Sequence, residues 1–197
     1  GYGGMVARVH SSSASAFGCI TIGIRVSHIK DKIDKGKQTE LLYLVDDETN
    51  PTKGFRLLVG GSNNPVTAKQ NSVYIHNIAD NTYSEYSTDI RDGSTDYQRE
   101  KDLVIVLRVY GVDGASGIQN KVFIQVDGIN GSSSLTLNNL NESEEWYVGI
   151  GSNLDQTGIS DVTNGSQFTF KELTLQEVQQ GTNPPDFNEL GRWLKHR

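Results

Sequence analysis

Two runs of alternating apolar residues, separated by a turn-rich segment, constrain this chain more than any other feature. In the segment DLVIVLRVYGVDGASGIQNKVFIQV, which begins at Asp102, every second residue is Leu, Ile or Val from 103 to 109 and again from 122 to 126. Alternation with a period of two places these side chains on one face of an extended strand. Because the residues between the runs favour turns, the pattern predicts an antiparallel β-hairpin.

Further short runs with strand character occur along the chain, with turn signals between them. They lie at 17–28, 38–45, 54–60, 72–77, 82–88, 145–151 and 167–178. The last run changes the phase of its alternation between Phe170 and Leu173, which predicts a β-bulge or bend. No helical pattern separates the runs, so the crossover connections of a parallel sheet are missing. The sequence therefore predicts an all-β, two-sheet antiparallel sandwich of the jelly-roll type.

One short helix is expected near the C-terminal end. Asp186 is placed to act as its N-cap, and Trp193 is expected to pack the helix down. The apolar residues that recur at helical spacing are Phe187, Leu190 and Leu194. The expected organisation is one sandwich domain over residues 1–180, followed by a linker and the helix over residues 181–197.

Composition and charge exclude several classes of protein. The formal net charge is −6, whereas a general nucleic-acid binder needs a basic face for phosphate contacts. No run of about 18 apolar residues occurs, so no membrane-spanning helix is expected. The single cysteine, Cys19, cannot form an intrachain disulfide and is expected to be a small buried core residue.

Several segments combine strand patterns with characteristic ends. In chain order they are LLYLVDDE followed by GFRLLV, then KVFIQVDG, and then WYVGIG followed by FTFKELTLQEV. This pattern, from Ala16 to Val178, resembles the concanavalin A-like lectin/glucanase superfamily, especially its laminin G-like jelly rolls. The resemblance implies a module that binds or cleaves glycans, with the sugar on the concave sheet or on loops at its rim.

Seven side chains on the expected strands point away from the Leu/Ile/Val face. They are Arg56, Tyr74, His76, Arg108, Tyr110, Phe123 and Gln125. If their strands are neighbours in one sheet, these residues form a connected cationic and aromatic surface on an otherwise acidic protein. Arginine can bind a carboxylate through two hydrogen bonds, and aromatic rings can cover the apolar faces of sugars. The set therefore predicts a binding site for an acidic or highly hydroxylated glycan, with a solvated outer face as the alternative.

The same residues leave an enzymatic alternative open. Some polysaccharide lyases of the superfamily use Arg, Gln or Asn, His and Tyr on the concave sheet, which implies roles for Arg56, His76, Asn77 and Tyr110. The R-x-E-x-R and Y-F-K-A-G-like strands of such lyases are absent, as is the E-x-D-x-E pattern of glucanases. A lyase or glycoside hydrolase therefore stays an alternative, and a non-catalytic module is preferred.

An acidic turn offers oxygen ligands for a metal ion, and calcium takes such ligands. These ligands are Asp46, Asp47 and Asn50. A second set consists of Asp155, Asp161 and Asn164. Ordinary turn-forming roles are the alternative for both sets. Calcium is the only cofactor that the sequence suggests.

The predicted function is that of a lectin-like module whose partner is a glycan or polysaccharide, without nucleic-acid binding or membrane insertion. The alternative class is an attachment or structural head domain of a viral or phage fibre or of a bacterial adhesin. Fibre heads are usually trimers, whereas carbohydrate-binding modules are mostly monomers, so a homo-oligomer is expected for the fibre head. Both functions place the protein outside the cell or on a virion surface.

Overall fold

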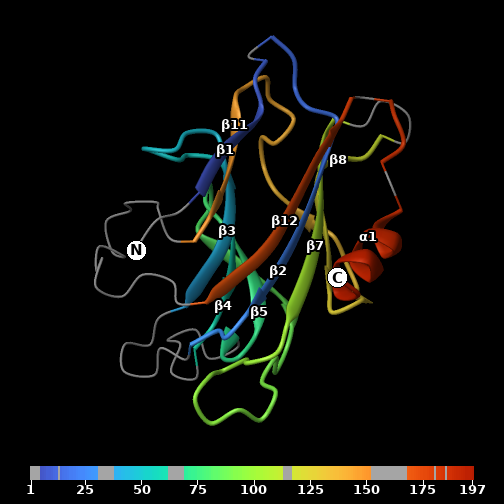
Figure 1. The fold of residues 1–197 in the computed structure, drawn as a ribbon. Coiled ribbons are helices and arrows are strands. Elements are labelled where there is room, and N and C mark those ends of the chain that lie inside the picture. The colour runs from blue at the N-terminus through green and yellow to red at the C-terminus, as the bar shows by residue number, and fades with distance from the viewer. Residues whose placement is uncertain are drawn as a thin grey trace.

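The computed structural model describes residues 5–12, 14–30, 38–61, 69–112, 117–151, 168–179, 181–184 and 186–197. Their strands form two antiparallel sheets that pack face to face, with one short helix near the C-terminal end (Figure 1). The all-β sandwich predicted from the sequence is therefore confirmed.

Sheet A has the strand order β1-β11-β3-β4-β5-β6. Its strands are β1 (Met5–His10), β11 (Trp146–Ile150), β3 (Thr39–Val45), β4 (Gly54–Val59), β5 (Val73–Asn77) and β6 (Thr82–Ser87). The strands from β3 to β6 are neighbours both in the chain and in the sheet. In contrast, β1 and β11 are brought together from distant parts of the sequence.

Sheet B has the strand order β10-β8-β7-β2-β12, and β9 pairs with β8 outside this path. Its strands are β10 (Leu135–Thr136), β8 (Gln119–Val126), β7 (Leu103–Val112), β2 (Cys19–Ser27), β12 (Thr169–Val178) and β9 (Ile129–Asn130). Strands β7 and β8 form the predicted hairpin, in a register that pairs Ile105 with Val126. The expected irregularity in the last strand is also confirmed, because the β12–β2 register shifts between Phe170 and Glu172.

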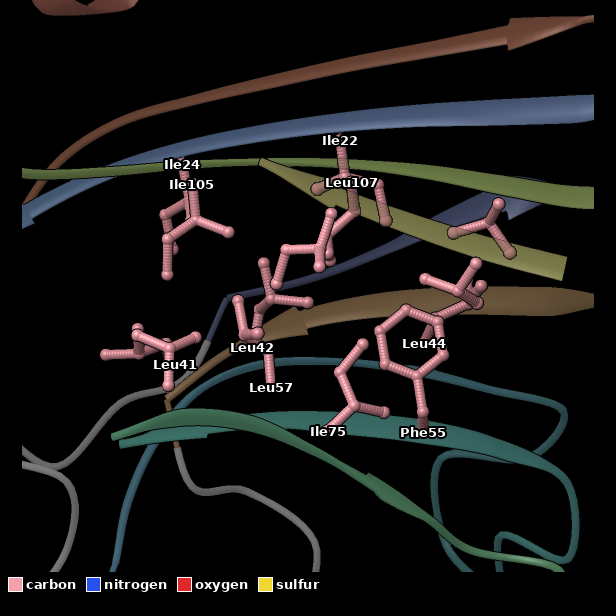
Figure 2. Close-up of a cluster of buried hydrophobic side chains, with 14 of the residues drawn as sticks. Ile22, Ile24, Leu41, Leu42, Leu44, Phe55, Leu57, Ile75, Ile105 and Leu107 are labelled. Atoms are coloured by element: carbon pink, nitrogen blue, oxygen red, sulfur yellow. The ribbon is translucent and has the colours of Figure 1, made fainter. Parts of the chain in front are cut away.

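The apolar faces of the two sheets meet in one core. Figure 2 shows side chains of β2 and β7 pointing toward those of β3, β4 and β5. The labelled residues are Ile22, Ile24, Leu41, Leu42, Leu44, Phe55, Leu57, Ile75, Ile105 and Leu107, all fully buried. Burial of such a side chain contributes roughly 1.5–3 kcal/mol to stability. The alternating apolar side chains that define the strands therefore also hold the two sheets together.

Helix α1 (Phe187–Lys195) begins where the sequence predicts. The Asp186 carboxylate accepts hydrogen bonds from the backbone N–H groups of Asn188 and Glu189, as an N-cap does. The helix lies on the outer face of sheet B, against β7 and β2 (Figure 1). In the described part of the chain, no helix is both long and apolar enough to span a membrane.

Leucines, not the tryptophan, anchor α1 to the sheet. Leu194 is fully buried against Val104 and Val106 of β7. Gly23 of β2 makes room for it, because a Cβ there would lie only 2.6 Å from Leu194 Cδ1. Trp193 is 43% exposed, so the expectation that it packs the helix down is wrong. Helical periodicity turns Trp193 away from the face that carries Leu194.

Candidate functional site

The seven residues that the sequence analysis grouped together divide between two sheets. Arg56 lies on β4, and Tyr74 and His76 lie on β5, all in sheet A. The other four, in sheet B, are Arg108, Tyr110, Phe123 and Gln125. Since each set points outward from the shared core, the two sets lie on opposite sides of the sandwich. The expectation of one connected surface is therefore wrong, because alternation fixes the face of a strand but not the sheet that it joins.

On sheet B, the predicted residues form one group. Arg108 of β7 is the register partner of Phe123 of β8. The Tyr110 and Phe123 rings meet edge to face, with centroids 5.8 Å apart and planes at 80°. This is a favourable arrangement for two aromatic rings. The hairpin therefore presents a guanidinium group and two rings on the same outer face.

Helix α1 and strand β9 enclose this group and turn it into a hollow of about 290 Å³. The described residues that line it are Arg108, Tyr110, Phe123, Ile124, Asn130, Gly131 and Phe187. The Arg108 guanidinium carbon lies 5.1 Å from the centroid of the Phe187 ring, a cation–π distance. Phe187 and Asn130 were not among the predicted site residues. The helical spacing of Phe187 indicates only that it lies on the packed face of the helix. Asn130 belongs to a strand of two residues, which is too short for an alternating pattern to reveal.

Gln125 has a different position from its three neighbours. It is 2% exposed and does not line the hollow. Its Nε2 donates one hydrogen bond to Oδ1 of Asn130, at 2.9 Å, and another to Oδ1 of Asn188, at 2.8 Å. Gln125 therefore lies beneath α1 and is hydrogen-bonded to both α1 and β9, the two segments that form the walls of the hollow beside the hairpin.

The described lining of the hollow contains one charged side chain, that of Arg108. Asp127, just beyond β8, is already paired: its Oδ2 accepts from Arg99 at 2.7 Å, and its Oδ1 accepts from the Val104 N–H at 3.1 Å. The described lining therefore combines one guanidinium group with three aromatic rings and an amide side chain.

The sheet A group is packed much more tightly. Arg56 pairs in register with Tyr43 on one side and His76 on the other, and it is 1% exposed. Its Nε lies 4.0 Å from a carboxylate oxygen of Glu40. Within the described part of the chain, Nε and Nη2 of Arg56 have no hydrogen-bond partner. Tyr74, the third predicted residue on this sheet, is also buried.

Burial changes the proton affinities of two groups beside Arg56. Burial raises the pKa of the Glu40 carboxyl to about 7, although the positive charge of Arg56 opposes this shift. Burial also lowers the pKa of His76, and the hydrogen bond from its ring to Asn81, at 2.8 Å, opposes that shift. The His76 ring stacks on Tyr83, with centroids 4.5 Å apart. Glu40, His76 and Tyr83 therefore form a packed polar cluster around Arg56.

The residues of the lyase alternative do not come together. Tyr110 lies on sheet B, on the opposite side of the sandwich from Arg56 and His76. Asn77 accepts a hydrogen bond from the backbone N–H of Ala79, within its own turn. The proposed catalytic set of Arg56, His76, Asn77 and Tyr110 is therefore contradicted.

The acidic turn after β3 forms local hydrogen bonds. The Asp46 carboxylate accepts from the backbone N–H groups of Thr52 and Lys53, and Asp47 accepts from those of Thr49 and Asn50. Among the described residues, no group of three or more His, Cys, Asp or Glu side chains could hold a metal ion. Calcium binding at Asp46, Asp47 and Asn50 stays a prediction, which a calcium-dependent rise in melting temperature would support. The second acidic set, Asp155, Asp161 and Asn164, lies outside the described residues.

No family model matches the chain, and no curated protein matches it significantly. Solved structures of the same fold do match it. The binding domain of botulinum neurotoxin serotype D has a TM-score of 0.54 at 10% identity, with 96% of this chain and 40% of that chain covered. Domain 4 of the extracellular GH43 arabinanase of Geobacillus stearothermophilus, in complex with arabinotriose, has a TM-score of 0.51 at 11% identity, with 91% and 69% covered. The CBM40 of the Ruminococcus gnavus IT-sialidase, bound to α2,6-sialyllactose, has a TM-score of 0.50 at 11% identity, with 95% and 96% covered.

These similarities show a shared fold. This chain spans less than half of the botulinum toxin chain and nearly all of the CBM40 chain. The protein therefore shares its two-sheet β-sandwich fold with a neurotoxin binding domain, an arabinanase domain and a CBM40.

Proposed function

We propose that this protein is a carbohydrate-binding module that takes a carboxylate-bearing sugar into the hollow between the β7–β8 hairpin, β9 and α1. The observation that carries the proposal is the convergence of Arg108, Tyr110, Phe123 and Phe187 on one hollow of about 290 Å³. Three of these residues come from the central hairpin and one comes from the helix. The protein would bind sugar without transforming it.

The chemistry of the lining suits a sugar acid. The aromatic rings can cover the apolar face of a pyranose ring, while the Asn130 amide can hydrogen-bond to its hydroxyl groups. The Arg108 guanidinium can bind a carboxylate through charge-assisted hydrogen bonds, which are stronger than neutral ones. The volume is close to the lower end of the range for small-molecule pockets, about 300 Å³. The hollow therefore suits a terminal sugar better than a long polymer.

The fold supports the same class of function. The arabinanase domain was solved with arabinotriose and the CBM40 with α2,6-sialyllactose. We also propose that the chain belongs to the laminin G-like branch of the concanavalin A-like superfamily, because the strand pattern from Ala16 to Val178 resembles it. A module of this kind would act outside the cell, where terminal acidic sugars are displayed.

A binding screen tests the proposal. α2,6-Sialyllactose and glucuronate carry the carboxylate, and lactose is the neutral control that matches sialyllactose. We expect the wild-type protein to bind an acidic sugar in preference to lactose. Arg108→Ala and Phe123→Ala should each weaken binding at least tenfold, a loss of about 1.4 kcal/mol.

The control substitution is Arg8→Ala. Arg8 lies on β1 of sheet A and pairs with Glu145 at the protein surface. Arg8→Ala removes one positive charge, as Arg108→Ala does, but from the opposite side of the sandwich. This control should therefore leave sugar binding unchanged. Equal binding of acidic sugars by the wild-type and Arg108→Ala proteins, with both folded, would exclude this site.

A further inference from the structure

Gln125 joins the two added walls of the hollow. Its single amide nitrogen donates to Asn130, on the β9 wall, and to Asn188, in the first turn of α1. Both acceptors are side-chain oxygens, and both distances are below 3.0 Å. One buried amide group therefore satisfies its two donors by holding together segments from distant parts of the chain.

The helix can cover Gln125 because residue 191 is a glycine. Gly191 is buried, and a Cβ at this position would collide with Oε1 of Gln125. The Gln125 side chain is thus enclosed between β8 and the backbone of α1. A hydrogen-bonding side chain enclosed in this way is costly to leave unpaired, so its two bonds resist disruption.

Each partner of Gln125 adjoins the lining of the hollow. Asn188 directly follows Phe187, and Asn130 itself lines the hollow beside Gly131. Arg108, on β7, lies at a cation–π distance from the Phe187 ring of the α1 wall. The separation of the α1 and β9 walls therefore depends on where Gln125 holds these two segments.

We infer that Gln125 is a positioning residue of the proposed sugar site, which ties α1 to β9 so that the hollow keeps its shape. Sugar binding and helix docking then stabilise each other, because linkage between two equilibria is reciprocal. The ligand side of this inference rests on the proposed function. The tie between the walls is a property of the unliganded protein and can be measured without a sugar.

Gln125→Leu tests the tie, because leucine has a similar size and no hydrogen-bonding group. Backbone hydrogen–deuterium exchange should become roughly tenfold faster in both α1 and residues 129–131, while β2 and β7 stay protected. Gln176→Leu, at an exposed glutamine of β12, is the matched control and should change neither segment. Asn188→Ala, at an exposed residue, removes only the hydrogen bond between Gln125 and α1, so it should loosen α1 alone. This variant provides the test if Gln125→Leu does not fold.

Titration with α2,6-sialyllactose tests the coupling to binding. Gln125→Leu should bind this sugar at least fivefold more weakly than the wild type, although it leaves every lining residue in place. In the wild type, the sugar should slow exchange in α1, and in Gln125→Leu this protection should be reduced. A residue that only stabilised the sandwich would lower the melting temperature without this selective change.

The possible outcomes separate the inference from the proposed function. Unchanged exchange in Gln125→Leu, or faster exchange in only one of the two segments, would overturn the tie. Wild-type affinity for sialyllactose in a Gln125→Leu protein with a loosened helix would overturn its positioning role. If the wild type binds none of the sugars, the proposed function fails, whereas the exchange data still decide whether Gln125 joins the walls.

Discussion

Arg56 and Arg108 project from opposite sides of the sandwich, Arg56 from β4 of sheet A and Arg108 from β7 of sheet B. Their surroundings differ as much as their positions. Arg56 is enclosed beside Glu40 and His76, whereas Arg108 faces the hollow that α1 helps to form. One arginine therefore belongs to a packed polar cluster, and the other lines the hollow that we propose as the sugar site.

The core between the sheets should dominate stability. Ile105→Ala removes a fully buried side chain from β7 and should lower the free energy of unfolding by about 2–5 kcal/mol, through lost burial and the cavity left behind. Ile129→Ala, at a residue that is 75% exposed, should change it by less than about 0.5 kcal/mol. Urea denaturation measures both. Similar losses for the two variants would contradict the arrangement of the core.

Glu40 should make the protein less stable as the pH rises from about 4.5 to about 7. Its pKa is higher in the folded protein than the ordinary value of 4.5, so the folded state holds the proton more tightly. The resulting stabilisation is complete below pH 4.5 and is lost as the pH passes the folded pKa of about 7. Over this pH range the free energy of unfolding should fall by about 3 kcal/mol, because each pKa unit corresponds to about 1.4 kcal/mol.

Thermal melts of Glu40→Gln across this pH range provide the measurement. Glutamine cannot ionise, so this part of the pH dependence should disappear. Glu100→Gln, at an exposed carboxyl, is the control and should keep the wild-type profile. A Glu40→Gln profile parallel to that of the wild type would show that Glu40 is not perturbed.

His76 should have the opposite effect over a neighbouring pH range. Its folded pKa lies below the ordinary value of 6.5, so the unfolded state binds the proton more readily. Its contribution to stability is present above pH 6.5 and decreases as the pH falls toward the folded pKa. His76→Gln should therefore remove this loss on the acid side, so that the melting temperature of the variant rises relative to that of the wild type as the pH falls below 6.5. A difference between the two melting temperatures that does not change with pH over this range would contradict the assignment.

Gly191→Ala separates helix propensity from helix docking. Alanine favours an isolated helix over glycine by about 1 kcal/mol, so propensity alone predicts stabilisation. In this protein, the new Cβ would displace the Gln125 amide from both of its hydrogen bonds. We expect a net loss of about 1 kcal/mol and faster exchange in α1. Arg192→Ala, at the next and exposed position, should be nearly neutral, and a stabilised Gly191→Ala protein would argue against the close fit.

The sequence predicts much of the fold because the signals for strands, turns and the helix cap each lie within a short stretch of the chain. Alternation from 103 to 109 and from 122 to 126 was sufficient to place the hairpin, and the Asp186 cap was sufficient to place the start of α1. The partner of each strand is not local information, since β1 pairs with β11 across more than half of the chain. For this reason Arg56 and Arg108 had the correct faces but were assigned to one surface.

The candidate site was predicted in part for the same reason. Arg108, Tyr110 and Phe123 share one hairpin, so their proximity follows from its register. Phe187 joins them only because α1 docks on sheet B, and that docking depends on the absent side chains of Gly23 and Gly191. The space that a glycine leaves for a distant element does not appear in any periodic pattern.

An NMR titration of the isotopically labelled protein with α2,6-sialyllactose tests the central claim most directly, because it locates the bound sugar. We predict that the largest shifts of the backbone amide signals will occur at Arg108, Phe123, Asn130 and Asn188, around the hollow on sheet B. The same titration with lactose should produce much smaller shifts. Shifts confined to the outer face of sheet A, around His76 and Tyr83, would contradict the account and place the ligand on the other side of the sandwich.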